Sequence, residues 1–433
     1  MSENMGLNAT PGGERIHIAI LGRMNAGKSS LINAITGQEL AIVSDVEGTT
    51  TDPVYKAMEI QPLGPVMCID TPGLDDTGKL GQQRTEKTMQ VIRKSHLALV
   101  VMDASVVEQE YHSGGEDALA FEKRIVRSLR ENQTPYVLVC NKTDLLADGG
   151  NVKEQLSRIW GKMDSTTVVE TSTETGEGIE ALKDAMVSLM PDGGQKSFII
   201  GDKLDAEDVT VLVTPIDSAA PKGRLILPQQ QTIRDILDAG AVCMVTRETE
   251  LPMTLKALAK PPKVVITDSQ VFERVSKDTP EDIYLTSFSI LFARHKGNLR
   301  LLVEGVKKLD ALEDGDRILI AEGCTHRRQC EDIGTVKIPR WIREYTGKDI
   351  KIETCSGTEF PQDVGGYAMV IHCGGCMLNP KEMGFRMELA KKQGVPIVNY
   401  GVLIAYLHGV LERSLELFPE IHALLDEDSG NAD

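Results

Sequence analysis

Three side chains able to bind a metal stand within the stretch HCGGC, from His372 to Cys376. A second such group, Cys324 and His326, lies earlier in the chain. Each group follows an apolar run, DRILIAEGC or GYAMVIHCGGC, that we expect to be a strand of a parallel sheet. Ligands collect beyond the carboxyl ends of such strands. We therefore expect the two groups to meet in one metal site.

The residue types leave more than one metal open. Cys324, Cys373 and Cys376 with a spare fourth position suit a 4Fe–4S cluster that has one exchangeable iron. A zinc site of three cysteines and one histidine is the competing interpretation, and a site without metal is the third. Structural zinc usually sits on small loop-rich modules, so we favour the cluster. His326 or His372 is the candidate for a further ligand, although neighbours in a strand face opposite sides, so His372 need not point with Cys373.

A phosphate-binding pattern opens the chain. The apolar run RIHIAILG leads into GRMNAGKSS, which has the spacing Gly-x4-Gly-Lys-Ser. Gly22 and Gly27 let backbone N–H groups approach phosphate oxygens, and the following helix adds positive potential at its N-terminus. Lys28 is expected to reach the outer phosphates, and the Ser29 hydroxyl to bind Mg²⁺.

Two later motifs specify the nucleotide. VMCIDTPG ends a strand-like run with Asp70, expected to hold Mg²⁺ through water, and Gly73, whose N–H can contact the γ-phosphate. NKTD, from Asn141 to Asp144, follows the run YVLVC, and its carboxylate can accept both N–H groups of a guanine edge, which adenine cannot offer. The stretch STE from Ser172 resembles a third guanine-contacting loop, with Thr-Glu in place of Ala-Lys. The sequence therefore predicts a GTPase.

The stretch VEGTTTDPV is similar to the first switch of the Era/TrmE-like GTPases of the translation-factor class. That resemblance implies that Thr50 binds Mg²⁺ and that Asn25 helps to bind a K⁺ ion. Leu74 stands where Ras-type enzymes place a water-orienting glutamine. Since leucine cannot polarise water, we expect slow hydrolysis that K⁺ stimulates. We assign Lys28, Thr50 and Gly73 to hydrolysis and Ser29, Thr50 and Asp70 to Mg²⁺. The predicted nucleotide-binding residues are Gly22, Asn25, Ala26, Gly27, Lys28, Ser29, Ser30, Thr49, Thr50, Asp70, Thr71, Pro72, Gly73, Asn141, Lys142, Asp144, Ser172 and Thr173.

Composition limits the class of protein. A chain of 433 residues that is 41% hydrophobic is expected to fold into two or three domains. A net charge of −17 disfavours a large nucleic-acid footprint. No run of 18 apolar residues and no signal sequence is present, so we expect a cytoplasmic protein without a membrane partner.

The order of strand-like and helix-like patterns along the chain predicts an α/β protein. We expect a disordered tail at 1–14, a GTPase domain with a mixed, mostly parallel sheet at 15–192, and a small α+β dimerisation domain at 198–260. From residue 261 to 433, strands and helices alternate, which predicts a parallel-sheet domain that carries the cluster.

Almost the whole chain resembles the HydF family of iron–iron hydrogenase maturation GTPases. The stretches GRLILPQ, SFSILFARHKGNL, AEGCTHRRQCEDIG and VIHCGGCMLN carry the resemblance, together with the GTPase motifs. It implies a homodimeric carrier that joins through its middle domain and holds a 4Fe–4S cluster on Cys324, Cys373 and Cys376. It also implies a diiron cargo received from radical-SAM maturases and delivered to apo-hydrogenase. An RNA- or ribosome-associated GTPase with a structural zinc site is the alternative.

Overall fold

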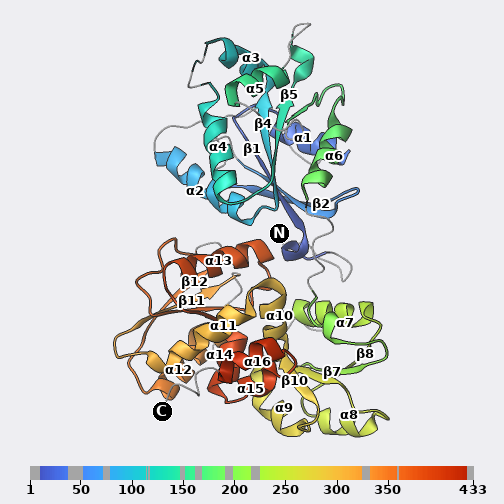
Figure 1. Cartoon of the computed structure of the whole chain (residues 1–433), viewed down its shortest axis with the longest axis vertical. Helices are drawn as coiled ribbons and strands as arrows, with labels where there is room; N and C mark the ends of the chain where they lie inside the picture. The colour runs from blue at the N-terminus through green and yellow to red at the C-terminus, as the bar shows by residue number, and fades with distance from the viewer. Residues whose placement is uncertain are drawn as a thin grey trace. The chain divides into compact units, whose positions relative to one another are not determined.

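The computed structural model describes residues 10–37, 52–71, 79–113, 115, 118–146, 152–160, 168–190, 198–215, 225–323, 332–357 and 360–426. It divides into two compact units, Met1–Gln195 and Lys196–Asp433 (Figure 1). Within the described ranges, no helix has both the length and the apolar character that a membrane span requires.

A mixed six-stranded sheet organises the first unit, as predicted. Its order is β2-β3-β1-β4-β5-β6, with β2 antiparallel to β3 and the other pairs parallel. The strands are β1 (Ile16–Gly22), β2 (Val54–Ile60), β3 (Gly64–Asp70), β4 (Leu97–Asp103), β5 (Tyr136–Asn141) and β6 (Val168–Glu170). The helices are α1 (Lys28–Thr36), α2 (Lys79–Lys94), α3 (Ala104–Ser113), α4 (Ala120–Glu131), α5 (Val152–Trp160) and α6 (Ile179–Leu189), with 3-10 turns η1 (Gly12–Glu14) and η3 (Thr143–Leu145).

Helices cover both faces of this sheet (Figure 1). Alternation along β1 sends Ile18 and Ile20 into a core with α1 and α6, and Ala19 and Leu21 into a core with α2, α3, α4 and α5. The prediction of a disordered tail at 1–14 is wrong for its last three residues, because Gly12–Glu14 form the 3-10 turn η1, in which Gly13 is buried. Residues 1–9 lie outside the described ranges.

The second unit begins with a four-stranded parallel sheet of order β10-β9-β7-β8. Its strands are β7 (Val209–Val213), β8 (Val242–Thr246), β9 (Val264–Thr267) and β10 (Tyr284–Ser287). Its helices are α7 (Leu227–Asp238), α8 (Leu251–Ala257) and α9 (Phe272–Asp278), with 3-10 turns η5 (Gly201–Lys203) and η6 (Ser269–Val271). Strands and helices alternate, so this region is α/β and not the α+β arrangement that we expected.

The predicted boundary between residues 260 and 261 falls inside this sheet. The run KVVITDSQ, which we expected in the C-terminal domain, supplies β9, and β9 pairs with β7. All four residues of β9 are buried. A short apolar run predicts a buried strand but carries no local signal for which sheet it joins, which explains the misplacement.

A second four-stranded parallel sheet, of order β12-β11-β13-β14, follows as predicted. Its strands are β11 (Arg317–Glu322), β12 (Lys351–Ser356), β13 (Met369–His372) and β14 (Ile397–Asn399). The remaining helices are α10 (Phe288–Lys296), α11 (Leu299–Val306), α12 (Ile338–Thr346), α13 (Pro380–Lys392), α14 (Tyr400–Leu407), α15 (Leu411–Leu415) and α16 (Pro419–Asp426), with a 3-10 turn η7 (Lys307–Ala311) and a π-helical turn η8 (Ile333–Lys337).

Two helical stretches of the second unit are interrupted. The stretch SFSILFARHKGNLRLLVEGVKKL forms α10 and α11, because α10 ends at Lys296 before Gly297, and Asn298 caps α11 by accepting the Leu301 N–H at 3.1 Å. The stretch AYLHGVLERSLELF breaks at Gly409, whose φ of 67° is left-handed.

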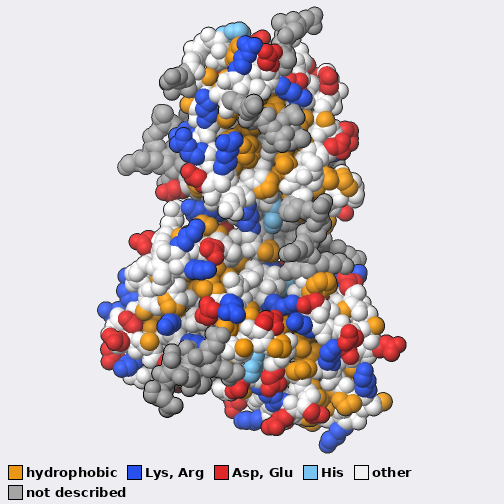
Figure 2. Space-filling view, in the orientation of Figure 1, with side chains coloured by type: hydrophobic (Ala, Val, Ile, Leu, Met, Phe, Trp, Pro, Cys, Tyr) orange, Lys and Arg blue, Asp and Glu red, His pale blue; other side chains and the backbone are white. Residues whose placement is uncertain are grey.

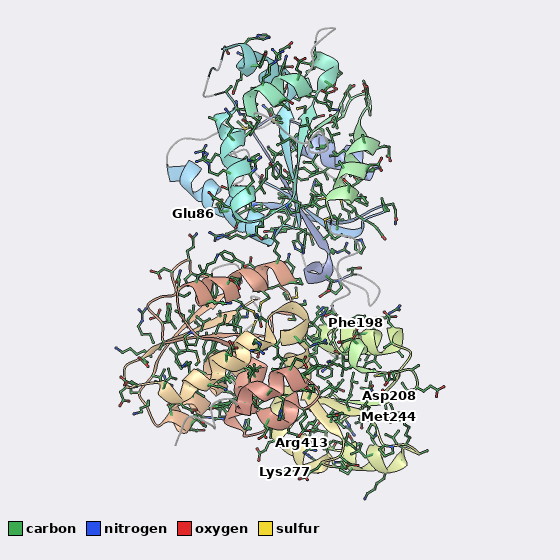
Figure 3. All side chains as sticks on the ribbon, viewed as in Figure 1. Glu86, Phe198, Asp208, Met244, Lys277 and Arg413 are labelled. Carbon is green, nitrogen blue, oxygen red and sulfur yellow. The ribbon has the colours of Figure 1, made fainter. Side chains whose placement is uncertain are left out.

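One hydrophobic core joins the two sheets of the second unit. Leu212 and Ile266 of the first sheet share it with Ile318 and Ile371 of the second, and α10 contributes Ile290 between them. Polar bonds add to this packing, since Arg413 of α15, labelled in Figure 3, donates to the carbonyl oxygens of Ser276, Thr279 and Pro280. On the face shown in Figure 2, acidic and basic side chains are interspersed among hydrophobic ones.

Candidate nucleotide and cysteine sites

The phosphate-binding loop joins β1 to α1, and two glycines give it its shape. A Cβ at Gly22 would lie 2.3 Å from a backbone oxygen of β4, and one at Gly27 would lie 2.2 Å from Asn141 Nδ2. Lys28 is the first residue of α1, and its Nζ donates to the carbonyl oxygens of Gly22 at 3.1 Å and Arg23 at 2.7 Å. The cation and the helix N-terminus therefore lie at the same turn, the arrangement that binds phosphate.

Two predicted Mg²⁺ ligands meet beside this loop. The Ser29 hydroxyl donates to Asp70 Oδ2 at 2.8 Å, although the residues are 41 positions apart. The other carboxylate oxygen, Asp70 Oδ1, is buried and has no hydrogen-bond partner among the described residues. A buried acceptor without a donor is costly unless a cation or water satisfies it. The pair therefore fits a hydrated Mg²⁺.

The predicted guanine-binding residues are tied to the phosphate loop. Asn141 is fully buried; its Nδ2 donates to the Ala26 carbonyl at 3.3 Å, and its Oδ1 accepts the Thr171 hydroxyl at 3.2 Å. Asn141 thus connects the phosphate loop to the loop after β6. Thr171 was missed by sequence reasoning, because its role depends on a contact 30 residues away.

The other predicted guanine-site residues follow the carboxyl ends of β5 and β6. The Ser172 hydroxyl donates to Asp144 Oδ1 at 2.5 Å and orients this exposed carboxylate. Lys142 has a left-handed φ of 65° and forms a 2.8 Å ion pair with Asp103, a second residue that the sequence did not indicate. Thr173 follows in the same loop and is half-buried.

Other predicted residues are placed as follows. Asn25 is exposed with φ 60°, and Ser30 is half-buried on α1. The Thr71 hydroxyl donates to the Ile20 carbonyl at 2.8 Å and so binds the backbone of β1. The predicted residues outside the described ranges are Thr49, Thr50, Pro72, Gly73, Cys324 and His326.

Arg23, inside the phosphate loop, forms an ion-pair cluster that sequence reasoning missed. Its guanidinium contacts Glu110 of α3 at 2.5 Å and Glu122 of α4 at 2.8 Å. Glu122 is 2% exposed, and burial raises the pKa of its carboxyl even though Arg23 opposes that rise. Glu110 is more exposed, and bonds from Arg23 and the Leu119 N–H lower its pKa despite burial acting the other way. The loop is therefore anchored to two helices.

The described cysteines of the predicted metal site lie at the carboxyl edge of the C-terminal sheet. Cys373 follows β13, and its N–H donates to the Ala321 carbonyl of β11 at 2.9 Å. Its Sγ accepts the backbone N–H groups of Gly323 at 3.0 Å and Gly375 at 3.4 Å. Burial raises the pKa of the Cys373 thiol, and the two N–H groups oppose this rise. Backbone N–H groups aimed at a buried sulfur favour its thiolate form, which is the form that binds metal.

His372 has both ring nitrogens engaged with the protein. Nδ1 contacts the Cys373 carbonyl oxygen at 2.8 Å, and Arg386 Nη1 lies 3.0 Å from Nε2. A carbonyl oxygen only accepts, so Nδ1 carries the proton and Nε2 accepts from Arg386. Burial, and then the charge of Arg386, lowers the pKa of His372 to about 3, so the ring is neutral. In this arrangement His372 offers no free lone pair to a metal.

The described residues include two of the three predicted cysteine ligands, Cys373 and Cys376. Cys376 is near enough for its charge to raise the pKa of Cys373, as does that of Glu322 at the end of β11. Gly323, which bonds the Cys373 sulfur, directly precedes Cys324 in the sequence. Over the residues that the structure describes, no group of three or more His, Cys, Asp and Glu side chains is arranged to hold a metal ion.

Three family models match consecutive parts of the chain. A 50S ribosome-binding GTPase model matches residues 17–142, a hydrogen maturase F dimerization domain model matches residues 199–297, and a hydrogen maturase F tetramerization domain model matches residues 300–417. The first unit is therefore a P-loop GTPase domain that binds GTP and Mg²⁺ and hydrolyses GTP.

The curated relatives match less than half of this chain. The tRNA modification GTPase MnmE of Chromobacterium violaceum is 32% identical over 178 residues, which is 41% of this chain and 35% of that protein. GTPase Der of Kosmotoga olearia is 29% identical over 214 residues, 47% of this chain and 43% of that protein. The chain thus spans about a third to two fifths of these relatives.

Among solved structures, Era of Aquifex aeolicus bound to GDP and AlF4⁻ covers 56% of this chain and 98% of its own, at 19% identity and a TM-score of 0.35. The probable GTP-binding protein engB covers 40% of this chain and 98% of its own, at 22% identity and a TM-score of 0.33. The family is shown by the models that follow the GTPase part. Since two hydrogen maturase F domains together account for residues 199–297 and 300–417, this chain belongs to the hydrogen maturase F family of GTPases in hydrogenase maturation.

Proposed function

We propose that this GTPase is a scaffold that binds a 4Fe–4S cluster on Cys324, Cys373 and Cys376 and carries a diiron precursor to apo-hydrogenase. The observation that carries the proposal is the Cys373 sulfur, which accepts two backbone N–H groups at the carboxyl edge of a parallel sheet. Radical-SAM maturases would supply the precursor, as the family resemblance implies. When bound, a cluster held by three cysteines supplies one iron with an exchangeable fourth position.

The chain's own residues have separate tasks in this proposal. Gly323 and Gly375 stabilise the Cys373 thiolate through their N–H groups. His372 keeps to hydrogen bonds within the protein, which leaves the fourth position of the iron to a group that exchanges more readily. In the first unit, Ser29, Thr50 and Asp70 would hold Mg²⁺, and loops ordered by the γ-phosphate would time the association with partners.

Anaerobic reconstitution with iron and sulfide tests the cluster. Wild-type protein should gain a broad absorption near 400 nm and an EPR signal on reduction, and Cys373→Ser should lose both. Cys355→Ser is the matched control, because this half-buried thiol of β12 is in the same sheet but is not assigned to the cluster. Zinc without iron in the wild-type protein, or a full cluster in Cys373→Ser, would contradict the proposal.

We also propose that K⁺ stimulates hydrolysis through Asn25, whose exposed amide lies inside the phosphate loop. Hydrolysis by the full chain should be faster in KCl than in NaCl at equal ionic strength, and Asn25→Ala should remove the difference. Equal rates of the wild-type protein in the two salts would count against this role.

The first sheet of the second unit, of order β10-β9-β7-β8 and called the middle sheet from here on, supports a homodimer. β8 is an edge strand of this sheet, and its residues Val242, Met244 and Val245 are 51%, 36% and 43% exposed. Figure 3 labels Met244 on this edge. An apolar edge strand has unpaired backbone groups and invites a second strand, and a second copy of this chain offers an identical one.

Sedimentation of the full chain tests this interface. Met244→Lys should shift the protein towards the monomer, since a lysine on an edge strand opposes pairing. Lys277→Met, on the exposed surface of α9, is the control and should sediment like the wild-type protein. A Met244→Lys protein that remains a dimer at micromolar concentration would refute pairing through β8.

A further inference from the structure

We propose that Lys296 and Arg386 are positioning residues that hold the two ends of the segment Cys373–Cys376 and so preorganise its thiols. The inference rests on the proposed cluster function, because it assigns a task to two buried cations that the motifs do not include. Lys296 bonds the backbone carbonyl of Cys376 directly. Arg386 holds His372, which in turn bonds the backbone carbonyl of Cys373.

The segment between β13 and α13 needs external support. Gly374 and Gly375 form its centre; Gly375 has a left-handed φ of 61°, and a Cβ at Gly374 would meet nothing within 4 Å. Paired glycines leave a turn with many accessible conformations, so its shape must come from contacts made by the flanking residues.

At the Cys373 end, support comes through Arg386. This side chain is 1% exposed, and its three nitrogens bond Glu382 at 2.9 Å, the Gly357 carbonyl at 2.8 Å and His372 Nε2 at 3.0 Å. With Nε2 held, the ring presents Nδ1–H to the Cys373 carbonyl at 2.8 Å. A planar guanidinium with every nitrogen engaged can hold an imidazole in one orientation.

At the Cys376 end, support comes from Lys296, the last residue of α10. The side chain is 3% exposed, and its Nζ donates to the carbonyl oxygens of Cys376 at 3.2 Å and Leu378 at 3.3 Å. Burying an ammonium group is costly, and these carbonyls replace part of the lost hydration. The carbonyl groups of Cys373 and Cys376 are therefore both bonded by buried nitrogen-bearing side chains.

This arrangement also sets the position of the Cys373 sulfur, because its N–H donor Gly375 is in the same segment and its other donor, Gly323, directly follows β11. A displaced segment would lose these N–H···S bonds. Groups that orient metal ligands typically change metal affinity about 10- to 100-fold when they are removed.

Two measurements on the full chain test the proposal, with the variants Lys296→Met, Lys296→Arg and Arg386→Met. Hydrogen exchange of the metal-free protein should be at least about tenfold faster across residues 373–378 in both Met variants. After anaerobic reconstitution, both Met variants should hold iron against a chelator about 10- to 100-fold less well than the wild-type protein. Lys392→Met, an exposed lysine of α13, is the matched control and should behave like the wild type.

The spectroscopic properties of the cluster separate positioning from mere support of the fold. Loss of the Lys296 charge should move the reduction potential of the cluster to more negative values, because the reduced cluster is then no longer stabilised by a nearby positive charge. Lys296→Arg keeps the charge and should return the potential most of the way to the wild-type value. If circular dichroism shows that Lys296→Met is unfolded, Lys296→Gln, which keeps a donor without the charge, replaces it in the same measurements.

The possible results are distinguishable. Wild-type protein that takes up no cluster would refute the proposed function, and the exchange rates would still decide the positioning role. A wild-type protein with a cluster, alongside Met variants that match Lys392→Met in exchange, iron retention and potential, would overturn the inference and leave the cluster proposal intact.

Discussion

Arg23 offers a sharp test of how the phosphate loop is held. Its guanidinium joins the loop to Glu110 and Glu122, which are 25% and 2% exposed. Arg23→Met would leave Glu122 buried without its opposite charge, whereas the more exposed Glu110 can be solvated. Removing one partner of a buried pair typically costs about 3–5 kcal/mol. Because Arg23 is itself 27% exposed, we expect the lower end, about 3 kcal/mol from the free energy of unfolding of the first unit.

The unpaired carboxyl also predicts the effect of pH. Burial already raises the pKa of Glu122, and loss of Arg23 should raise it further. A carboxyl whose folded pKa lies above its unfolded pKa loses stability as pH rises through the folded value. The destabilisation by Arg23→Met should therefore be larger at pH 8 than at pH 5.5, where the carboxyl can bind a proton.

The assay uses the two tryptophans of the chain. Trp160 lies in α5 of the first unit and Trp341 in α12 of the second. In a Trp341→Phe background, fluorescence during urea unfolding reports the first unit of the intact chain. The double variant Arg23→Met/Glu122→Gln removes the buried charge, and it should recover about 2 kcal/mol if the pair is coupled as the distances indicate. A loss below about 1 kcal/mol for Arg23→Met, or no recovery in the double variant, would refute this reasoning.

Three further predictions concern single residues. Asp144→Asn should weaken GTP binding about 100-fold and favour xanthosine triphosphate, because it removes a charge-assisted acceptor from the guanine site; unchanged GTP affinity in a fluorescence titration would contradict the assignment. Burial lowers the pKa of His17, so its contribution to stability should be full above about pH 6.5 and be lost as pH falls, and melting curves of His17→Gln should depend less on pH in that range. The Oδ2 of Asp235 accepts the N–H groups of Ile199, Ile200 and Gly201 at 3.1, 2.7 and 2.6 Å. Asp235→Ala should therefore lower the free energy of unfolding of the second unit by about 3 kcal/mol, and Asp235→Asn by less, as measured by Trp341 fluorescence in a Trp160→Phe background.

Motifs predicted those parts of the fold and site that follow from local chemistry. Ser29 and Asp70 are 41 residues apart, yet their motifs assigned both to one Mg²⁺ site, and the structure brings the two side chains into contact. The position of Cys373 at a sheet edge was likewise expected from the apolar run before it. In each case a short sequence pattern predicts both a strand and the residue at which the strand ends.

Contacts without a local pattern could not be predicted. Arg386 lies 14 residues after the histidine that it orients, and Lys296 lies 80 residues before the cysteine whose carbonyl it bonds. In the sequence, both resemble ordinary helix-surface cations, since basic residues are mostly exposed. Their burial follows from the packing of α10 and α13, which no spacing within one helix reveals.

The cysteine site depends on both halves of the second unit. Lys296 ends α10, which falls within the part matched by the dimerization domain, whereas Cys376 falls within the part matched by the tetramerization domain. The two sheets also share one hydrophobic core, to which α10 contributes Ile290 and Leu291. Since a closely packed core passes displacements from one element to the next, a shift of α10 against the middle sheet would move the Lys296 ammonium group relative to the Cys376 carbonyl. The geometry of the cysteine segment is therefore set by the middle sheet as well as by the sheet that carries it.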